Sequence, residues 1–159
     1  MLDIYNETFR TYGTKKIDVH KRYNDFNSAI WLNKPKNGLW ASPLEGRGYY
    51  TWRNFCKDED FRLNSLSKHA DFKLKKGSKI LMLEDTASIL RAFKKYKIND
   101  GYLISDSYLN WNKISAEYDA VWFNNSKMDF DILYDLRMTS WDCDSICVFN
   151  LNAVEVIKK

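Results

Sequence analysis

The residues best suited to chemistry lie in two places, one in the first third of the chain and one near its end. His20 and Arg22 end a short alternation of apolar and polar residues, and the segment Gly-Leu-Trp-Ala-Ser follows at 38–42. Near the end of the chain, Asp142 and Asp144 precede an apolar run. An imidazole or guanidinium, a hydroxyl beside an aromatic ring and a carboxylate are groups that acid–base and electrostatic catalysis use. We therefore expect three strands to deliver them to one cleft.

The two acids near the end have two interpretations. In a strand, Asp142 and Asp144 would point to the same side, because alternate residues share a face. Two carboxylates on one face before a buried run favour a role at a site, while exposure to solvent at the mouth of the strand is the alternative. The second histidine, His69, lies in a polar connection and is interpreted as a surface residue.

Several familiar catalytic motifs are missing from the sequence. There is no Gly-x-Ser-x-Gly elbow and no P-loop, and the Gly-Arg-Gly segment at 46–48 is too short for a dinucleotide fingerprint. Cys143 and Cys147 are four residues apart, which is a ligand spacing in a helix, but the segment is predicted as a strand and no second cysteine pair exists. We therefore predict no metal site.

Length and composition limit the class of protein. The 159 residues fit a single domain spanning 1–159, and 45% hydrophobic residues suffice for a packed core. Aromatic residues make up 16%, which indicates either an aromatic core or rings that line a pocket for a flat ligand. The net charge of +4 is compatible with an anionic ligand but is weak for a dedicated nucleic-acid binder. Three cysteines, with no signal peptide and no membrane span, predict a cytoplasmic protein with reduced thiols.

Strands and helices follow one another irregularly, which predicts an α+β fold rather than a regular doubly wound sheet. Strands are expected at 15–23, 39–42, 70–74, 79–84, 102–104, 118–123, 146–149 and 154–157. Helices are expected at 51–57, 59–67, 86–96, 109–115 and 128–136. Residues 24–36 form either a short helical turn or an irregular loop, and residues 44–50 form a loop.

The order of these motifs resembles the ADP-ribosyltransferase fold, and most of all its small bacterial and bacteriophage members. The matching features are a strand ending in His or Arg, Gly-Leu-Trp-x-Ser, an aromatic helix, Tyr-Asp-x-Val and an acid before Val-Phe-Asn. The resemblance implies a split, mostly antiparallel sheet with flanking helices and with NAD, as substrate, in a central cleft. It also implies transfer of ADP-ribose to an acceptor protein or nucleic acid by a toxin or phage effector. Such an effector would act in the cytoplasm of a bacterial or phage-infected cell, with an inhibitor or antitoxin protein as a candidate partner and no membrane.

The resemblance further implies roles for individual residues around the NAD molecule. His20, with Arg22 as the alternative, would contact the ribose or phosphate of NAD. On the next strand, Ser42 would supply a hydroxyl. The remaining matches would contact NAD from the same strand or lie beside its nicotinamide ring, and they are Gly38, Leu39, Trp40, Tyr49 and Tyr50.

The third motif of that family is an acid, usually Glu, that stabilises the oxocarbenium-like transition state, and Asp142 and Asp144 are the candidates here. Alignment on the Val-Phe-Asn run at 148–150 puts Ser145 at the position of the family's glutamate. Asp144 is then one residue early, and a slip of one residue turns a strand side chain to the other face. Either a bulge re-aims Asp144, or the acid comes from elsewhere, or the chain is an inactive nucleotide- or partner-binding member of the fold. A small nucleic-acid-binding protein that uses its aromatic residues is the alternative from another class.

Overall fold

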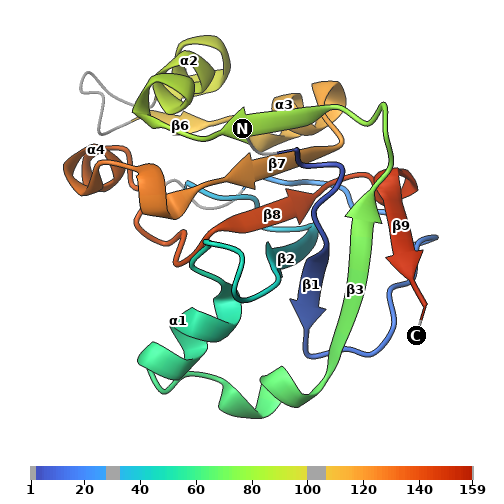
Figure 1. The fold of residues 1–159 in the computed structure, drawn as a ribbon. Coiled ribbons are helices and arrows are strands. Elements are labelled where there is room, and N and C mark those ends of the chain that lie inside the picture. Colours follow the sequence, from blue (N-terminus) through green and yellow to red (C-terminus); the bar gives the residue numbers. More distant parts are fainter. Residues whose placement is uncertain (1–2, 28–32, 100–106, 159) are drawn as a thin grey trace.

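A seven-stranded, mostly antiparallel sheet is the framework of this mixed α+β fold (Figure 1). The computed structural model describes residues 3–27, 33–99 and 107–158. The strands of the sheet are β1 (Phe9–Tyr12), β2 (Leu39–Pro43), β3 (His69–Leu74), β4 (Ile80–Leu83), β7 (Ala120–Phe123), β8 (Ser145–Val148) and β9 (Val154–Ile157). They lie in the order β4-β7-β8-β2-β1-β3-β9, and the β4–β7 pair is parallel, whereas the other pairs are antiparallel. The expected α+β class is confirmed at this level.

The helices gather mainly beside one half of this sheet. They are α1 (Trp52–Asp58), α2 (Thr86–Tyr96), α3 (Trp111–Glu117) and α4 (Phe130–Asp135), with the 3-10 helices η1 (Leu63–Ser67), η3 (Asn125–Lys127) and η4 (Leu151–Ala153). A second sheet pairs the short strands β5 (Lys97–Asn99) and β6 (Ser107–Leu109) next to α2. Helices α2, α3 and α4 lie near β4 and β7, whereas α1 and η1 lie at the opposite end of the molecule (Figure 1).

Strand β7 shows how the sheet is buried on both faces. Val121 and Phe123 belong to the hydrophobic cluster that includes residues of α2, α3 and α4. Ala120 and Trp122 point to the other face and belong to a second cluster, in which the Trp122 ring packs 6.0 Å from that of Phe9 on β1. Because alternate residues of a strand face opposite sides, an uninterrupted apolar strand requires cover on both sides. One face of the β4-β7-β8 part of the sheet therefore packs against β1 and its neighbours.

Strand β2 changes its partner along its length, and this opens the sheet. Its first residues, Leu39–Ala41, pair with β8, whereas Ser42 and Pro43 pair with β1. Strand β1 pairs with β2 only through Phe9 and Arg10 and then continues along β3. From the Arg10–Ser42 pair, β1 continues toward Tyr12 along β3, whereas β2 runs back toward Leu39 along β8. The two strands therefore separate, and their register leaves a gap between their side chains.

Helices α1 and α2 begin where the sequence predicts because each has a capping box. The side chain of Thr51 accepts a hydrogen bond from the backbone N–H of Asn54, and that of Asp85 accepts one from Ser88. These bonds satisfy N–H groups that the first turn of a helix leaves without partners.

The strand expected at 15–23 is wrong, and the strand beside β2 is instead β1 at 9–12. Asp18 accepts hydrogen bonds from the backbone N–H groups of His20 and Lys21, through its side chain and its carbonyl respectively, so the segment turns there. An Asp side chain that bonds the backbone two residues later favours a turn over a strand. Local alternation alone therefore misplaced this strand.

Other expectations differ from the structure only in part. The helix expected at 59–67 is reduced to η1, and the strand expected at 102–104 lies outside the described residues. Within the described ranges, the helices are all too short or too polar to cross a lipid bilayer.

Candidate functional site

The gap between the diverging strands β1 and β2 is a cleft of about 710 Å³. A volume in this range is typical of sites for small molecules and cofactors. Its lining comes from the end of β1, the start of β2, the loops at 34–36 and 140–143, and the segment that carries α1 and η1. Four stretches that are distant in the sequence, 10–13, 34–41, 52–65 and 140–145, therefore meet at one cavity.

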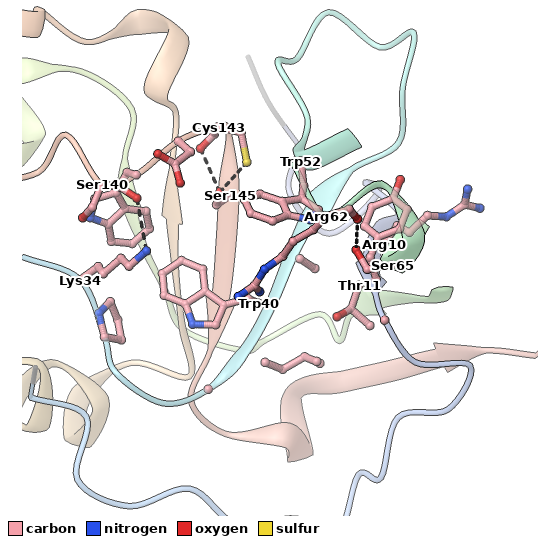
Figure 2. A pocket seen from close by; sticks show the side chains of 18 of the residues that line it. Arg10, Thr11, Lys34, Trp40, Trp52, Arg62, Ser65, Ser140, Cys143 and Ser145 are labelled. Atoms are coloured by element: carbon pink, nitrogen blue, oxygen red, sulfur yellow. Dashed lines mark hydrogen bonds between the residues drawn. The ribbon is translucent and has the colours of Figure 1, made fainter. Parts of the chain in front are cut away.

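One wall of the cleft, which we call the loop wall, is formed by residues 33–41 and 140–143. The rings of Trp40 and Trp141 lie edge to face with their centres 5.1 Å apart. Lys34 holds its ammonium 5.6 Å from the centre of the Trp40 ring and donates a hydrogen bond to the carbonyl of Ser140 at 3.3 Å (Figure 2). A single lysine therefore bridges the two segments of this wall.

Asn33 anchors the loop wall from behind. Its side chain is fully buried, donates to the carbonyl of Leu136 at 2.6 Å and accepts from the backbone N–H of Leu109 at 2.8 Å. Its carbonyl accepts from the indole of Trp141 at 2.8 Å, and the Trp141 ring stacks on Phe123 at 4.5 Å. Buried hydrogen bonds of this kind fix the positions of the groups they join.

The opposite wall, which we call the arm, is the segment 51–67. Trp52 faces the cleft, with its ring stacked on Phe55 at 5.4 Å and set edge-on to Phe61 at 6.1 Å. Arg62 also lines the cleft, and Figure 2 shows its side chain extending from the arm toward Trp40. Among the described residues, no carboxylate lies within ion-pair distance of Arg62.

The arm is attached to the sheet at its two ends. The backbone N–H of Trp52 donates to the hydroxyl of Ser42, which is 1% exposed. At the other end, the backbone N–H of Gly13 donates to the carbonyls of Ser65 and Lys68. Ser42 therefore has a structural partner at the start of α1, which sequence reasoning did not foresee.

Asp142 is the one carboxylate among the described residues that line the cleft. Its side chain is half-buried. Burial raises the pKa of Asp142, while the positive charge of Lys34 lowers it and the negative charge of Glu59 raises it further. The carboxylate thus faces a cation from the loop wall and an acid from the arm.

Asp144, two residues later, has a different environment. It is 0% exposed, and its oxygens accept hydrogen bonds from the backbone N–H groups of Tyr50 and Ser126, each at 3.0 Å. Its own N–H donates to the carbonyl of Tyr50 at 2.8 Å. The side chain therefore ties the start of the arm to the sheet and does not line the cleft.

The expectation that these two acids share one face does not hold. Both precede β8, which begins at Ser145, so the alternation of a strand does not apply to them. The irregular backbone directs one carboxylate into the cleft and the other into the interior.

The structure brings only some of the expected site residues together. Gly38, Leu39, Trp40 and Asp142 line the cleft. The other expected residues lie outside the cleft. His20 and Arg22 are exposed, Ser42 and Asp144 are buried, and Tyr49 and Tyr50 are half-buried. The ring of Tyr49 packs against Trp122, and the hydroxyl of Tyr50 donates to Asp58, so both tyrosines have structural contacts.

Several side chains of the cleft were not expected from the sequence, and the most important are Arg10, Trp52 and Arg62. The β-prone run Phe-Arg-Thr-Tyr before Gly13 is a signal that could have found Arg10. Its guanidinium is held by Asp71 through two hydrogen bonds of 2.7 and 2.8 Å. No comparable local signal exists for Trp52 and Arg62, because only the packing of the arm brings them to the cleft.

The thiols near the cleft are poor nucleophiles. Cys143 lines the cleft, and burial raises its pKa to about 12, so it stays protonated at neutral pH. Burial also raises the pKa of Cys147 well above the usual range. Nowhere in the described residues do three His, Cys, Asp or Glu side chains gather as a metal site would require.

Comparisons with known proteins add no family. A scan of the sequence against protein-family models found no match, and searches of curated proteins and of solved structures found none. A functional conclusion must therefore come from the cleft itself.

Proposed function

We propose that the cleft binds NAD, that the chain cleaves the bond between nicotinamide and ribose, and that it transfers ADP-ribose to an acceptor protein or nucleic acid. The observation that carries this proposal is Asp142, the one carboxylate among the described residues of a cleft whose lining includes three tryptophans and several cations. Cleavage of a glycosidic bond builds positive charge on the sugar, and a carboxylate beside that carbon stabilises it. The resemblance left open whether Asp142 or Asp144 stabilises the transition state, and this proposal assigns that role to Asp142.

The other side chains of the cleft suit the remaining parts of a dinucleotide. Nicotinamide and adenine are flat, and the open face of Trp52 offers a stacking surface for one of them. The pyrophosphate needs a cation, and Arg62 is suited to it because a guanidinium can bond two phosphate oxygens at once. Arg10 is less available, since Asp71 already holds two of its N–H groups.

The arrangement of the sheet supports an ADP-ribosyltransferase-like assignment. In that fold NAD lies in a central cleft of a split, mostly antiparallel sheet. The cleft of this chain lies where β1 and β2 separate. Arg10, on β1, lines the cleft at the strand position that the resemblance gave to His20, and its ion pair with Asp71 leaves Arg62 as the cation for the pyrophosphate.

The test is release of nicotinamide from NAD by the purified chain, read together with the thermal shift that NAD causes. We expect the Asp142→Asn chain to lose at least about 100-fold in rate while NAD still raises its Tm. His20→Ala is the matched control, because His20 is exposed and lies outside the cleft, and we expect it to keep the rate of the unaltered chain. Full activity of Asp142→Asn would remove Asp142 from the mechanism, and the absence of both release and thermal shift would overturn the proposal.

A second candidate is a non-catalytic member of the same fold that binds a nucleotide. One observation favours it: Asp144, the acid nearest to the position of the family's glutamate, is buried and fully bonded. Thermal stabilisation by NAD without any release of nicotinamide would select this candidate.

A further inference from the structure

Lys34 joins the two segments of the loop wall at the point where Asp142 enters the cleft. Its ammonium bonds the carbonyl of Ser140, two residues before Asp142, and lies over the ring of Trp40 on β2. An ammonium over the face of a tryptophan is attracted by the electron-rich ring. The side chain is therefore held by contacts on both sides (Figure 2).

The backbone that carries Lys34 is fixed independently of these contacts. The N–H of Asn33 donates to the carbonyl of Arg137 at 3.2 Å, in addition to the buried side-chain bonds of Asn33. Pro35, on the other side, is buried and has a restricted φ. The position of the ammonium is therefore set by the fold rather than by solvent.

The charged groups around Asp142 come from both walls. Lys34 faces it from the loop wall and Glu59 from the arm. Two thiols, Cys143 and Cys56, also lie close enough to interact electrostatically with Asp142, but burial raises the pKa of both, so they contribute no charge at neutral pH. Among the cations that line the cleft, Lys34 is the one whose charge acts on this carboxylate, and it opposes both burial and Glu59.

We propose that Lys34 is a positioning residue for Asp142, which ties the 140–142 segment to Trp40 and holds an ammonium beside the carboxylate. Its role in a reaction rests on the function proposed above, whereas its effect on Asp142 does not. Loss of the ammonium would leave burial and Glu59 unopposed, and the proton would then stay on Asp142 to a higher pH.

The experiment follows the carboxyl of Asp142 by NMR as the pH is changed, in chains with ¹³C-labelled aspartate. The Asp142→Asn chain assigns the signal. We expect Lys34→Gln to move the titration of Asp142 to higher pH and Lys34→Arg to leave it close to that of the unaltered chain. The matched control is Lys36→Gln, since Lys36 also lines the cleft but pairs with Asp25 at 2.6 Å.

The second readout is the pH profile of nicotinamide release. We expect Lys34→Gln to shift the acidic limb of the profile to higher pH and to lower kcat about tenfold at neutral pH with little change in KM, as for loss of a group that acts on the catalytic carboxylate. If Lys34 only stabilised the fold, Lys34→Gln would lower the Tm and leave the pH profile of nicotinamide release unchanged. That result would overturn the proposal.

The two proposals fail separately. An unmoved titration of Asp142 in a folded Lys34→Gln chain would overturn the role of Lys34, whether or not NAD is cleaved. A shifted titration in a chain that does not bind or cleave NAD would support the role of Lys34 and overturn the proposed function. Should Lys34→Gln fail to fold, an unchanged titration in Lys34→Met would overturn the role, and an upward shift would support it.

Discussion

The two walls of the cleft are built in different ways. The loop wall is fixed by buried bonds of Asn33 and by the Trp141 ring, which is 1% exposed. The arm leaves large apolar side chains in solvent, with Phe61 41% and Leu63 44% exposed. Elements with few buried contacts open at lower free energy than the core does. The cleft thus combines a rigid wall that carries Asp142 with a more loosely packed wall that carries Arg62.

Asp144 is the point at which the two walls meet. It bonds Tyr50, just before the arm, and Ser126, beyond the end of β7. Mutations at this joint, within the loop wall and within the arm should therefore have effects of decreasing size on the free energy of unfolding.

The largest effect is expected from Asp144→Ala. The substitution removes the acceptor for two backbone N–H groups in a fully buried place, and we expect it to lower the free energy of unfolding by about 3 kcal/mol. Urea unfolding followed by tryptophan fluorescence measures this. Asp142→Ala is the control and should cost less than about 1 kcal/mol, because its carboxylate faces the cleft. Equal costs for the two variants would remove the distinction between a structural and a cleft-facing acid.

Within the loop wall, Gly38→Ala should cost about 2 kcal/mol. A Cβ at Gly38 would lie 2.5 Å from the sulfur of Cys147 and 3.0 Å from the carbonyl oxygen of Val148, and the φ of +129° is unfavourable for alanine. The same substitution at Gly46, where no heavy atom lies within 4 Å of the added Cβ, isolates the contribution of the contact from that of the positive φ. A Gly46→Ala cost as large as that of Gly38→Ala would show that packing against β8 is not the cause.

In the arm, Phe61→Ser should cost about 1 kcal/mol or less, since much of the ring is already in solvent. Its contacts with Trp52 and Phe55 are local to the arm, so the loss should be local too. Hydrogen exchange should show faster exchange in 52–67 and unchanged exchange in 144–148. A matching acceleration in β8 would mean that the arm and the loop wall unfold as one unit.

The smallest effect is a pH-dependent gain in stability for Asp142→Asn. Because burial raises the pKa of Asp142, the folded chain keeps this proton to a higher pH than the unfolded chain does. The stability that the proton contributes is present below the unfolded-state pKa and is lost as the pH rises through the folded-state pKa. At neutral pH Asp142→Asn should therefore raise the free energy of unfolding by less than about 1 kcal/mol, a small gain because the half-exposed charge is screened by solvent.

Thermal melts at neutral and strongly acidic pH test whether Asp142→Asn raises or lowers the stability of the fold. The Tm of Asp142→Asn should exceed that of the unaltered chain at neutral pH, and the difference should vanish when the carboxyl is protonated in both states. A lower Tm at neutral pH would mean that the ionised carboxylate stabilises the fold, and the cation of Lys34 would then outweigh burial.

Much of the secondary structure could be predicted from the sequence because its causes are local. The expected helix at 86–96 has the bounds of α2, and the strand at 39–42 corresponds to β2. The expected strand at 15–23 failed because alternation gives no information on whether a partner strand exists. The same limit explains why β1, which has a partner on each side, was overlooked.

What the sequence by itself determined is the set of local structures and the chemical types available: capped helices, apolar strands, and tryptophans, cations and acids in number. Only the tertiary structure decided which of them share a cleft. Asp142 and Asp144 are chemically identical and two residues apart, yet their roles differ because Asp144 finds its partner at Tyr50, 94 positions away in the chain. The direction of a side chain in an irregular segment depends on such distant partners, which no local pattern encodes.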